Sequence, residues 1–300
     1  MKRRSTINKL LTVMSICLCS SGYSEYPYVL NDNASAGAND KFESVTVLSN
    51  GGYSSSLYVG DGSKLEANNV SIYVESTGYG ATLVVNGGSF SANSLTMTGS
   101  GAEGNDAYLD LMGGTSVIGS LISYGSIYVG VNGGNVTFGN VNLGTGSHFS
   151  AGYSGPNAYD TTASMTLNGT IKTDTFTIGA NLTSIALGDS LLNQSVNGSI
   201  EVFKYQLVSP NLDPATDHDV LDTILYAEKL LKEAIYDYNL SADKSYDLSN
   251  AKVVVHYDTA NMRGPGSITI EGVQSIPEPS SATLGILGLS ALLLRRKRRD

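Results

Sequence analysis

Residues 83–97 read LVVNGGSFSANSLTM, and this stretch contains the unit that is repeated through the middle of the chain. Apolar side chains alternate at Leu83 and Val85, and the turn sequence Asn-Gly-Gly separates them from further apolar positions that begin at Phe90. A period of two places alternate side chains on one face of a β-strand. Asn and Gly supply the positive φ angles that sharp corners need. The stretch therefore predicts a strand, a tight turn and a second strand.

The same order recurs from about residue 50 to residue 179, so this part of the chain is a repeat. Spacings of 25, 26, 20 and 36 residues separate its turn glycines, and a period of 20 to 26 residues is typical of one coil of a solenoid. The longest spacing holds the Gly- and Ser-rich segment 144–159, which predicts a loop. The turn glycines are Gly62, Gly87, Gly113, Gly133 and Gly169, and the runs before them are Leu57–Val59, Leu83–Val85, Leu109–Leu111, Tyr128–Val131 and Met165–Leu167.

Two all-β architectures fit this pattern over residues 23–200. An antiparallel sandwich or barrel also has short strands joined by Gly-containing turns. The unit keeps one order and is long for a simple hairpin, which favours a parallel β-helix, a solenoid whose coils stack around an apolar core. The pattern loosely resembles the Gly-rich passenger repeats of autotransporter adhesins. The predicted fold class is therefore all-β, a parallel β-helix with a helix-containing cap at its C-terminal end.

The composition changes after residue 200, and residues 201–272 predict this cap. Residues 217–238 show apolar positions at helical spacing, from Val220 to Ile235, with acidic residues in the first turn. Residues 252–257 and 267–270 predict further strands. We expect the helix and these strands to cover the open end of the solenoid, because an uncovered end exposes unpaired backbone groups.

The N-terminus, residues 1–22, predicts a secretory signal peptide. Basic residues precede a short apolar run, Leu10 to Leu18, and small residues follow it. The expected partner is signal peptidase, with cleavage after Gly22. Both cysteines, Cys17 and Cys19, lie in this leader, so the mature chain is expected to lack disulfides.

Residues 273–300 have three parts in order: a Pro-Glu-Pro motif, an apolar segment at 280–294, and a cluster of cations. As a helix the segment is about 22 Å long, short for a permanent transmembrane anchor but adequate for a transient one. The cations after it resist transfer across the inner membrane. An ordinary C-terminal membrane anchor is the alternative interpretation. The motif residues are Pro277, Glu278, Pro279, Arg295, Arg296, Lys297, Arg298 and Arg299.

This tail, from Ile276 to Arg299, closely resembles the PEP-CTERM sorting signal of Gram-negative bacteria. The resemblance implies recognition by an exosortase-type membrane protease and cleavage near the motif. It also implies transfer to the cell surface or to an exopolysaccharide matrix. Mature domains in that family are diverse, so the resemblance implies a destination and leaves the activity open.

The charge of the body argues against nucleic acid as a partner. Four of the 18 cations lie in the leader and five in the terminal cluster, while all 27 acids but Asp300 lie between them, which leaves a net charge of −17. Such a body repels DNA, RNA and anionic lipid. It is suited to divalent cations or basic polymers, although surface acids also serve only to keep an exported protein soluble.

The sequence contains no catalytic motif that we recognise. His148 in a polar segment, His218 at a helix start and His256 in a strand have no partners at metal-ligand or nucleophile spacing. Asp106 and Asp110 lie close in sequence, but we interpret them as a solvated edge. We therefore expect a non-enzyme without a cofactor or metal. Helix capping is the preferred explanation for the densest acid cluster, which calcium could also occupy: Asp213, Asp217, Asp219 and Asp222.

The predicted function is that of a structural or adhesive protein of the cell surface or exopolysaccharide matrix. The alternatives are a β-helical polysaccharide lyase or hydrolase, and a carbohydrate-binding module. Exposed aromatic rings stack on sugars, although β-propensity and cross-strand pairing explain tyrosines in strands equally well. The tyrosines that we expect on outer positions are Tyr53, Tyr58, Tyr73, Tyr79, Tyr108, Tyr124 and Tyr128.

Overall fold

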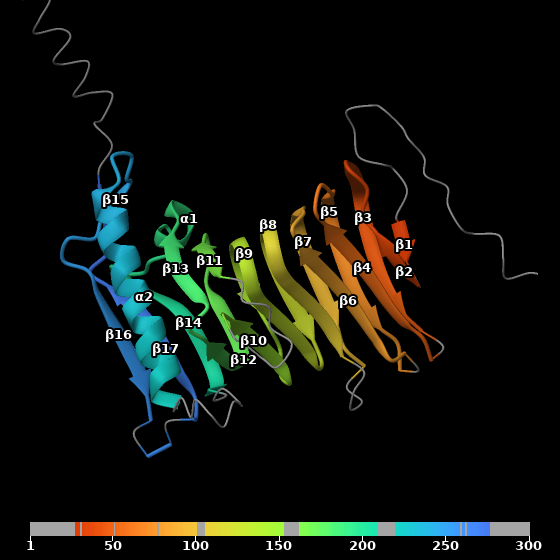
Figure 1. Cartoon of the computed structure of the whole chain (residues 1–300). Coiled ribbons are helices and arrows are strands. Elements are labelled where there is room, and N and C mark those ends of the chain that lie inside the picture. The colour runs from red at the N-terminus through yellow and green to blue at the C-terminus, as the bar shows by residue number, and fades with distance from the viewer. Residues whose placement is uncertain are drawn as a thin grey trace, which may run out of the picture.

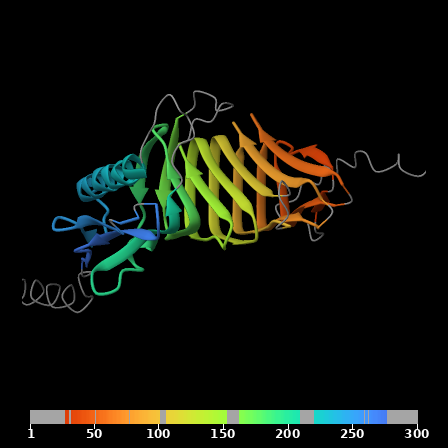
Figure 2. The same ribbon diagram turned by 90° about the horizontal axis from the view of Figure 1, so that it is seen from below.

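The protein folds into one large, mostly parallel β-sheet with two helices at its C-terminal end (Figure 1). The structure is a computed structural model that describes residues 28–276 except 31, 51, 77, 101–105, 153–161, 209–219, 259 and 262. The 16-stranded sheet runs through the molecule in nearly sequential order, and a two-stranded sheet is separate from it. Figure 2 shows the strands side by side from the N-terminal end of the described chain to α2. The all-β prediction is confirmed.

The elements have the following bounds in chain order. The strands are β1 (Tyr28–Leu30), β2 (Asn33–Ser35), β3 (Asp40–Ser49), β4 (Ser54–Gly60), β5 (Lys64–Val74), β6 (Gly80–Asn86), β7 (Ser89–Thr98), β8 (Ala107–Tyr124), β9 (Ile127–Asn142), β10 (Ser147–Ala151), β11 (Ala163–Leu167), β12 (Ile171–Ile178), β13 (Leu182–Leu187), β14 (Ser199–Val208), β15 (Tyr246–Asp247), β16 (Lys252–Tyr257), β17 (Gly266–Glu271) and β18 (Gln274–Ser275); the helices are α1 (Asp189–Leu192) and α2 (Val220–Leu240).

The parallel strands β1 to β13, which we call the ladder, pair with strands one repeat further along the chain. Corresponding residues in neighbouring strands are 25, 26, 20 and 29 residues apart, as the register from Lys64 through Ser89, Thr115 and Asn135 to Ser164 shows. The first three spacings are those predicted from the turn glycines. Equivalent side chains therefore lie next to each other in columns across the sheet.

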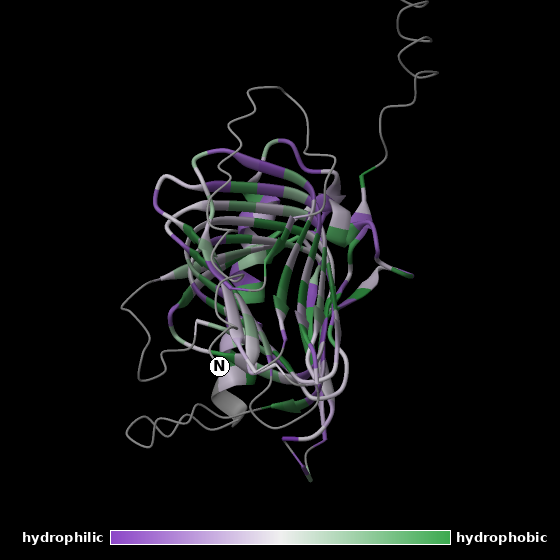
Figure 3. Ribbon diagram, turned by 90° about the vertical axis from the view of Figure 1, so that its right-hand side faces the viewer, coloured by the Kyte–Doolittle hydropathy of each residue, from purple (hydrophilic) through white to green (hydrophobic). Residues whose placement is uncertain are grey.

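The alternating apolar positions form the core of the ladder. One column joins Leu57, Leu83, Leu109, Val129 and Phe149, and each of these side chains is at most 2% exposed. Polar and apolar residues alternate along individual strands in the view of Figure 3. Burial of one such side chain contributes about 1.5–3 kcal/mol relative to exposure, so the repeated column is the main stabilising feature.

The fifth repeat was predicted in the wrong position. Met165 lies beside Val136, in the second strand of the unit and not in the first. The first-strand position is held by Phe149 of β10, which pairs with Val129. Residues 147–151 are thus a strand inside the segment predicted to be a loop. The flanking Gly and Ser residues concealed the short alternation of Phe149 and Ala151.

The double glycines at the corners have a second role besides turn formation. In the pair Gly113-Gly114 the positive φ falls on the second residue, Gly114 (+71°). A Cβ atom on Gly114 would lie 2.0 Å from the backbone oxygen of Gly88 in the neighbouring strand. Both the backbone conformation and the close approach therefore require glycine here.

Hydrogen bonds also join polar side chains of neighbouring strands in the ladder. The Asn68 amide Nδ2 donates to Glu43 Oε2 at 2.6 Å, and Asn93 Nδ2 donates to Asn68 Oδ1 at 2.8 Å. The three residues belong to successive strands β3, β5 and β7. The shared register places equivalent side chains of successive strands at hydrogen-bonding distance, so these bonds follow from the repeat.

The parallel pairing ends in the C-terminal region, residues 189–276. β14 pairs in parallel with β12 on one side and antiparallel with β17 on the other. α2 begins at Val220 and ends at Leu240, against a predicted helix at 217–238 whose first three residues lie outside the described part of the chain. Its apolar face, including Leu230 and Leu231, is buried against the core.

α2 also provides a hydrogen-bond donor to the backbone of the edge strand β13. The Tyr226 hydroxyl donates to the backbone oxygen of Leu182 at 2.9 Å, at the start of β13. This strand has no partner beyond β11 within the described sheet. A helix side chain thus contacts a backbone acceptor that a further parallel strand would otherwise occupy, as expected of a capping element.

Candidate functional site

Three aromatic side chains form a row across neighbouring strands of the ladder. Tyr108 of β8, Tyr128 of β9 and His148 of β10 occupy equivalent register positions. Their ring centroids are 6.3 Å apart for the first pair and 6.2 Å for the second. The next residue of each strand, such as Leu109, is fully buried, so the row projects from the opposite, outer face. All three rings are partly exposed. We call Tyr108, Tyr128 and His148 the aromatic row.

Carboxylates lie beside this row. The Tyr108 hydroxyl donates to Asp106 Oδ2 at 3.3 Å, and Asp174 Oδ2 accepts a hydrogen bond from the Gly146 backbone at 2.8 Å. Burial lowers the pKa of His148, while the negative charges of Asp174 and Asp106 oppose that shift without reversing it. The imidazole is therefore neutral at neutral pH, and the row presents uncharged rings between acidic groups.

Gly130 makes room for a polar cluster next to the aromatic row. A Cβ atom at Gly130 would lie 3.0 Å from Asn132 Nδ2, 3.0 Å from the Tyr128 ring and 3.3 Å from Asp110 Oδ1. Burial raises the pKa of Asp110, because desolvation disfavours its charged form. Ser150 pairs with Gly130, and its buried Oγ has no hydrogen-bond partner among the described residues.

The structure does not favour Asp106 and Asp110 as a hydrolytic pair. Asp106 comes just before β8 and Asp110 lies in it, with Tyr108 between them, and an extended chain places Cα atoms four residues apart at a separation of about 13 Å. Paired carboxyl groups in glycoside hydrolases face each other across the scissile bond, about 5–9.5 Å apart, with no protein side chain between them. The two groups instead lie on either side of the Tyr108 ring.

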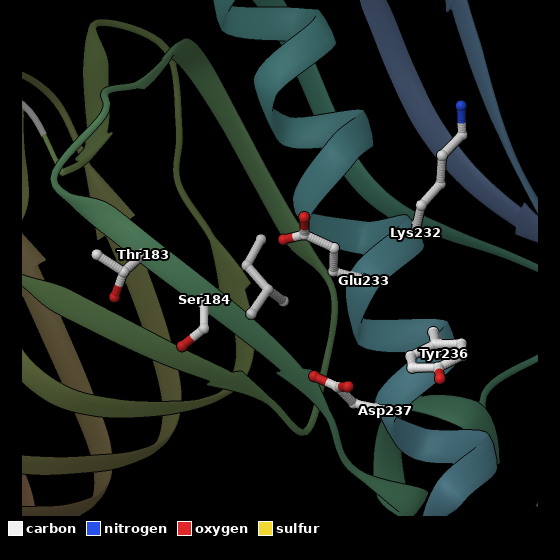
Figure 4. Close-up of a pocket in the computed structure, with 7 residues that line it drawn as sticks. Thr183, Ser184, Lys232, Glu233, Tyr236 and Asp237 are labelled. Carbon is white, nitrogen blue, oxygen red and sulfur yellow. The ribbon is translucent and has the colours of Figure 1, made fainter.

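A shallow groove of about 470 Å³ lies between β13 and α2 (Figure 4). The carboxylates of Glu233 and Asp237 lie on its helix side, one turn apart, and Thr183 and Ser184 lie on its strand side. Lys232 points away in Figure 4, and its Nζ pairs with Glu228 at 2.7 Å. The groove is thus acidic and polar.

The remaining candidate residues predicted from the sequence lie partly inside and partly outside the residues that the structure describes. The leader and the entire sorting motif lie outside the described residues, as do His218 and the acids Asp213, Asp217 and Asp219. Asp222 lies in α2, and His256 is exposed in β16. Within the described ranges, no three His, Cys, Asp or Glu side chains are grouped as metal ligands.

The predicted outer tyrosines point outward, with differing exposure. Tyr108 and Tyr128 are partly exposed, whereas the others are open to solvent: Tyr53 (71%), Tyr58 (45%), Tyr73 (39%), Tyr79 (63%) and Tyr124 (60%). Sequence reasoning missed His148 as their neighbour, because it lies in the segment predicted to be a loop. The alternation in Ser-His-Phe-Ser-Ala at 147–151 was the signal that could have identified it.

Comparison of the chain with protein-family models, with curated proteins and with solved structures finds no match. In the part of the chain that the structure describes, no helix has the length and apolar character needed to cross a membrane. The predicted segment 280–294 lies outside that part. The function is therefore argued from the residues themselves.

Proposed function

We propose that this chain is an exported, non-enzymatic protein of the cell surface or exopolysaccharide matrix, with a β-solenoid body that serves as a scaffold or adhesive element. The observation that carries the proposal is the long parallel ladder with its outward-facing tyrosines. The ladder builds an extended surface from repeated units, and the buried columns keep it rigid. A rigid, extended surface suits a protein that holds other matrix components.

Two features support a solenoid as the architecture of the body. Strands pair in parallel at spacings of 20 to 29 residues, which leaves room for one complete coil between partners. Three runs in one unit, at 81–85, 89–92 and 95–98, pair with their counterparts in the next unit. Such pairing fits successive coils stacked on one another, with the C-terminal region as the cap.

The ends of the chain support export and sorting. The leader at 1–22 fits the substrate pattern of signal peptidase, and the tail at 273–300 fits that of an exosortase-type protease. In this proposal the segment 280–294 holds the chain in the inner membrane until cleavage near Pro277-Glu278-Pro279 releases the body. The mature protein then reaches the surface or the matrix.

A carbohydrate-binding function is the second candidate, and the aromatic row favours it. Partly exposed rings beside hydrogen-bonding side chains are suited to sugar recognition. A glycan lyase or hydrolase remains the third interpretation, and release of reducing or unsaturated sugar ends from a glycan by the purified protein would establish it.

The test of the main proposal is the intact mass and location of the native protein in its own cells. We expect a mature form that lacks both ends and is found outside the cytoplasm. Replacing Pro277-Glu278-Pro279 by three alanines should leave an unprocessed, membrane-bound form. The matched control replaces the exposed residues Gln274 and Ser275 just before the motif by alanine, and it should be processed normally. Normal release of the motif variant, or a full-length cytosolic protein, would contradict the proposal.

A further inference from the structure

We propose that the aromatic row binds a neutral, hydroxyl-rich glycan whose chain runs along the ladder, across the strands. This inference rests on the proposed function and deepens it, because it names the class of ligand and the surface that holds it. The row comprises Tyr108, Tyr128 and His148, with Asp106 and Asp174 beside it.

The row offers both kinds of contact that a sugar ring makes, apolar contact with one face and hydrogen bonds with its rim. The C–H groups on one face of a pyranose ring pack on aromatic rings. The hydroxyl groups at the rim of the sugar need acceptors, which the carboxylates of Asp106 and Asp174 supply. Hydrogen bonds to charged acceptors are stronger than those between neutral groups.

The geometry of the ladder gives the binding surface a direction. Thr82 pairs with Tyr108, and Ser56 pairs with Thr82, so partly exposed hydroxyl groups extend the row toward the N-terminal end. Five neighbouring strands, from β4 to β10, contribute one side chain each. At a strand spacing of about 4.8 Å the extended row is about 19 Å long, enough for several sugar rings.

Charge selects the kind of glycan. The body carries a net charge of −17 and the row has acids on both sides, so a uronic-acid polymer is repelled. No lysine or arginine is in the extended row from Ser56 to His148 to pair with an anionic group. A cationic glycan would prefer the groove between β13 and α2, where Glu233 and Asp237 lie one turn apart. The uncharged rings are thus suited to a neutral chain.

The experiment measures retention of the purified mature protein in native gels that contain a soluble polysaccharide. Four neutral probes are used: hydroxyethylcellulose, a β-1,3-glucan, a galactomannan and dextran. Alginate is the anionic probe and chitosan the cationic probe. We expect retention by at least one neutral probe and none by alginate. Absence of retention by all four neutral probes would overturn the proposal.

Substitutions then locate the binding surface. Tyr128→Ala should weaken binding of the retained neutral glycan about tenfold, which corresponds to about 1.4 kcal/mol. Tyr128→Phe, which keeps the ring, should bind within about threefold of the original protein. Tyr236→Ala is the matched control, because Tyr236 is 64% exposed and lines the groove between β13 and α2, not the row, so this variant should bind the neutral glycan normally.

Two further measurements keep the result interpretable. Thermal unfolding of each variant shows whether it is folded, and if Tyr128→Ala is not, His148→Ala and the Phe variant are compared instead. Unchanged binding in folded variants of the row, or equal loss in Tyr236→Ala, would refute the proposed site. Retention by chitosan alone, lost in the Glu233→Gln/Asp237→Asn double variant, would also refute the proposed site, because binding would then take place in the groove between β13 and α2. Export and processing are measured separately, so failure of sorting and failure of glycan binding are distinguishable.

Discussion

The ladder and the C-terminal region are built on different principles. In the ladder each strand repeats the one before it, so like side chains meet like: Leu83 meets Leu109, and Asn68 meets Asn93. In the C-terminal region unlike elements meet, as where Tyr226 of α2 contacts the backbone of β13. In a repeat the same side-chain packing recurs between every pair of units, but the last unit has an exposed edge strand that must be covered by a different kind of element.

The core composition also changes between the two regions. Most buried side chains in the N-terminal part of the ladder are aliphatic, with Phe90 as an exception, while buried aromatic rings gather near the junction. At the junction, the Phe176 ring contacts Phe149 of the ladder and two rings of the C-terminal region. Its centroid is 6.5 Å from that of Phe149, 5.0 Å from that of Phe203 and 5.3 Å from that of Tyr205. The difference indicates that the junction is joined by a few large contacts, whereas the ladder is joined by many small ones.

The largest expected effect comes from removing the central ring of this junction. Phe176→Ala should lower the free energy of unfolding by about 3–5 kcal/mol, because it leaves a cavity among fully buried rings. Urea unfolding measures the change. Phe42→Ala is the matched control: Phe42 also stacks on an aromatic ring, Tyr28, but it is only partly buried and should cost less than half as much. Equal costs would contradict the importance of the junction.

The next largest effect is expected from a substitution that disturbs the close spacing of neighbouring strands in the ladder. A Cβ atom on Gly139 would lie 1.8 Å from the backbone oxygen of Gly119 in the neighbouring strand, so Gly139→Ala should destabilise the protein by about 3 kcal/mol. At Gly60 the nearest atom to an added Cβ is 4.0 Å away, and Gly60→Ala should change stability by less than about 1 kcal/mol. Urea midpoints of the two variants compare them directly. A tolerated Gly139→Ala would show that the strand spacing adapts.

A smaller effect tests how α2 protects the edge. Tyr226→Phe removes the hydroxyl that donates to Leu182 and should cost about 1 kcal/mol. In Tyr226→Phe, amide hydrogen exchange in β13 should become faster than in the original protein, while exchange in the central strand β8 stays the same. Tyr236→Phe changes a tyrosine of the same helix that is 64% exposed at the rim of the groove, and it should leave both stability and exchange unchanged. Equal exchange in the two variants would mean that the hydroxyl does not protect the edge.

The smallest effect depends on pH. Burial raises the pKa of Asp110 above its ordinary value of 3.8, so the folded protein binds this proton more tightly than the unfolded chain does. The stability due to the protonated form is present at low pH and is lost as the pH rises through the interval above 3.8. Asp110→Asn should therefore be more stable than the original protein at pH 7, with a difference that shrinks toward pH 3.

Glu66 provides a control of opposite sign. Hydrogen bonds from Lys41 and Lys64 lower the pKa of Glu66, so its contribution is present at neutral pH and is lost as the pH falls through the lowered pKa. Glu66→Gln should be less stable than the original protein at pH 7 and should approach it at low pH. Urea midpoints from pH 3 to 7 measure both variants. Parallel curves for the two substitutions would contradict these pKa directions.

Much of this fold was predictable because local patterns agree with the tertiary structure. The alternation at Leu83 and Val85, and the helical period after Val220, each have one favourable burial pattern. The fifth repeat was not predictable, since both Phe149 and Met165 begin short alternating runs and only the pairing with β9 assigns them. The row was predicted in part: its tyrosines were expected on the outside, but His148 was not.

The sequence by itself determined that strands would alternate with tight Gly-containing turns, that a helix would follow them, and which side chains would be buried. These properties depend on the local period of apolar residues and on backbone freedom at glycine. Only the tertiary structure decided which repeats are neighbours, that Tyr108, Tyr128 and His148 form one row, and that α2 lies against β13. Contacts between residues far apart in the chain depend on register and insertion length, which no local pattern specifies.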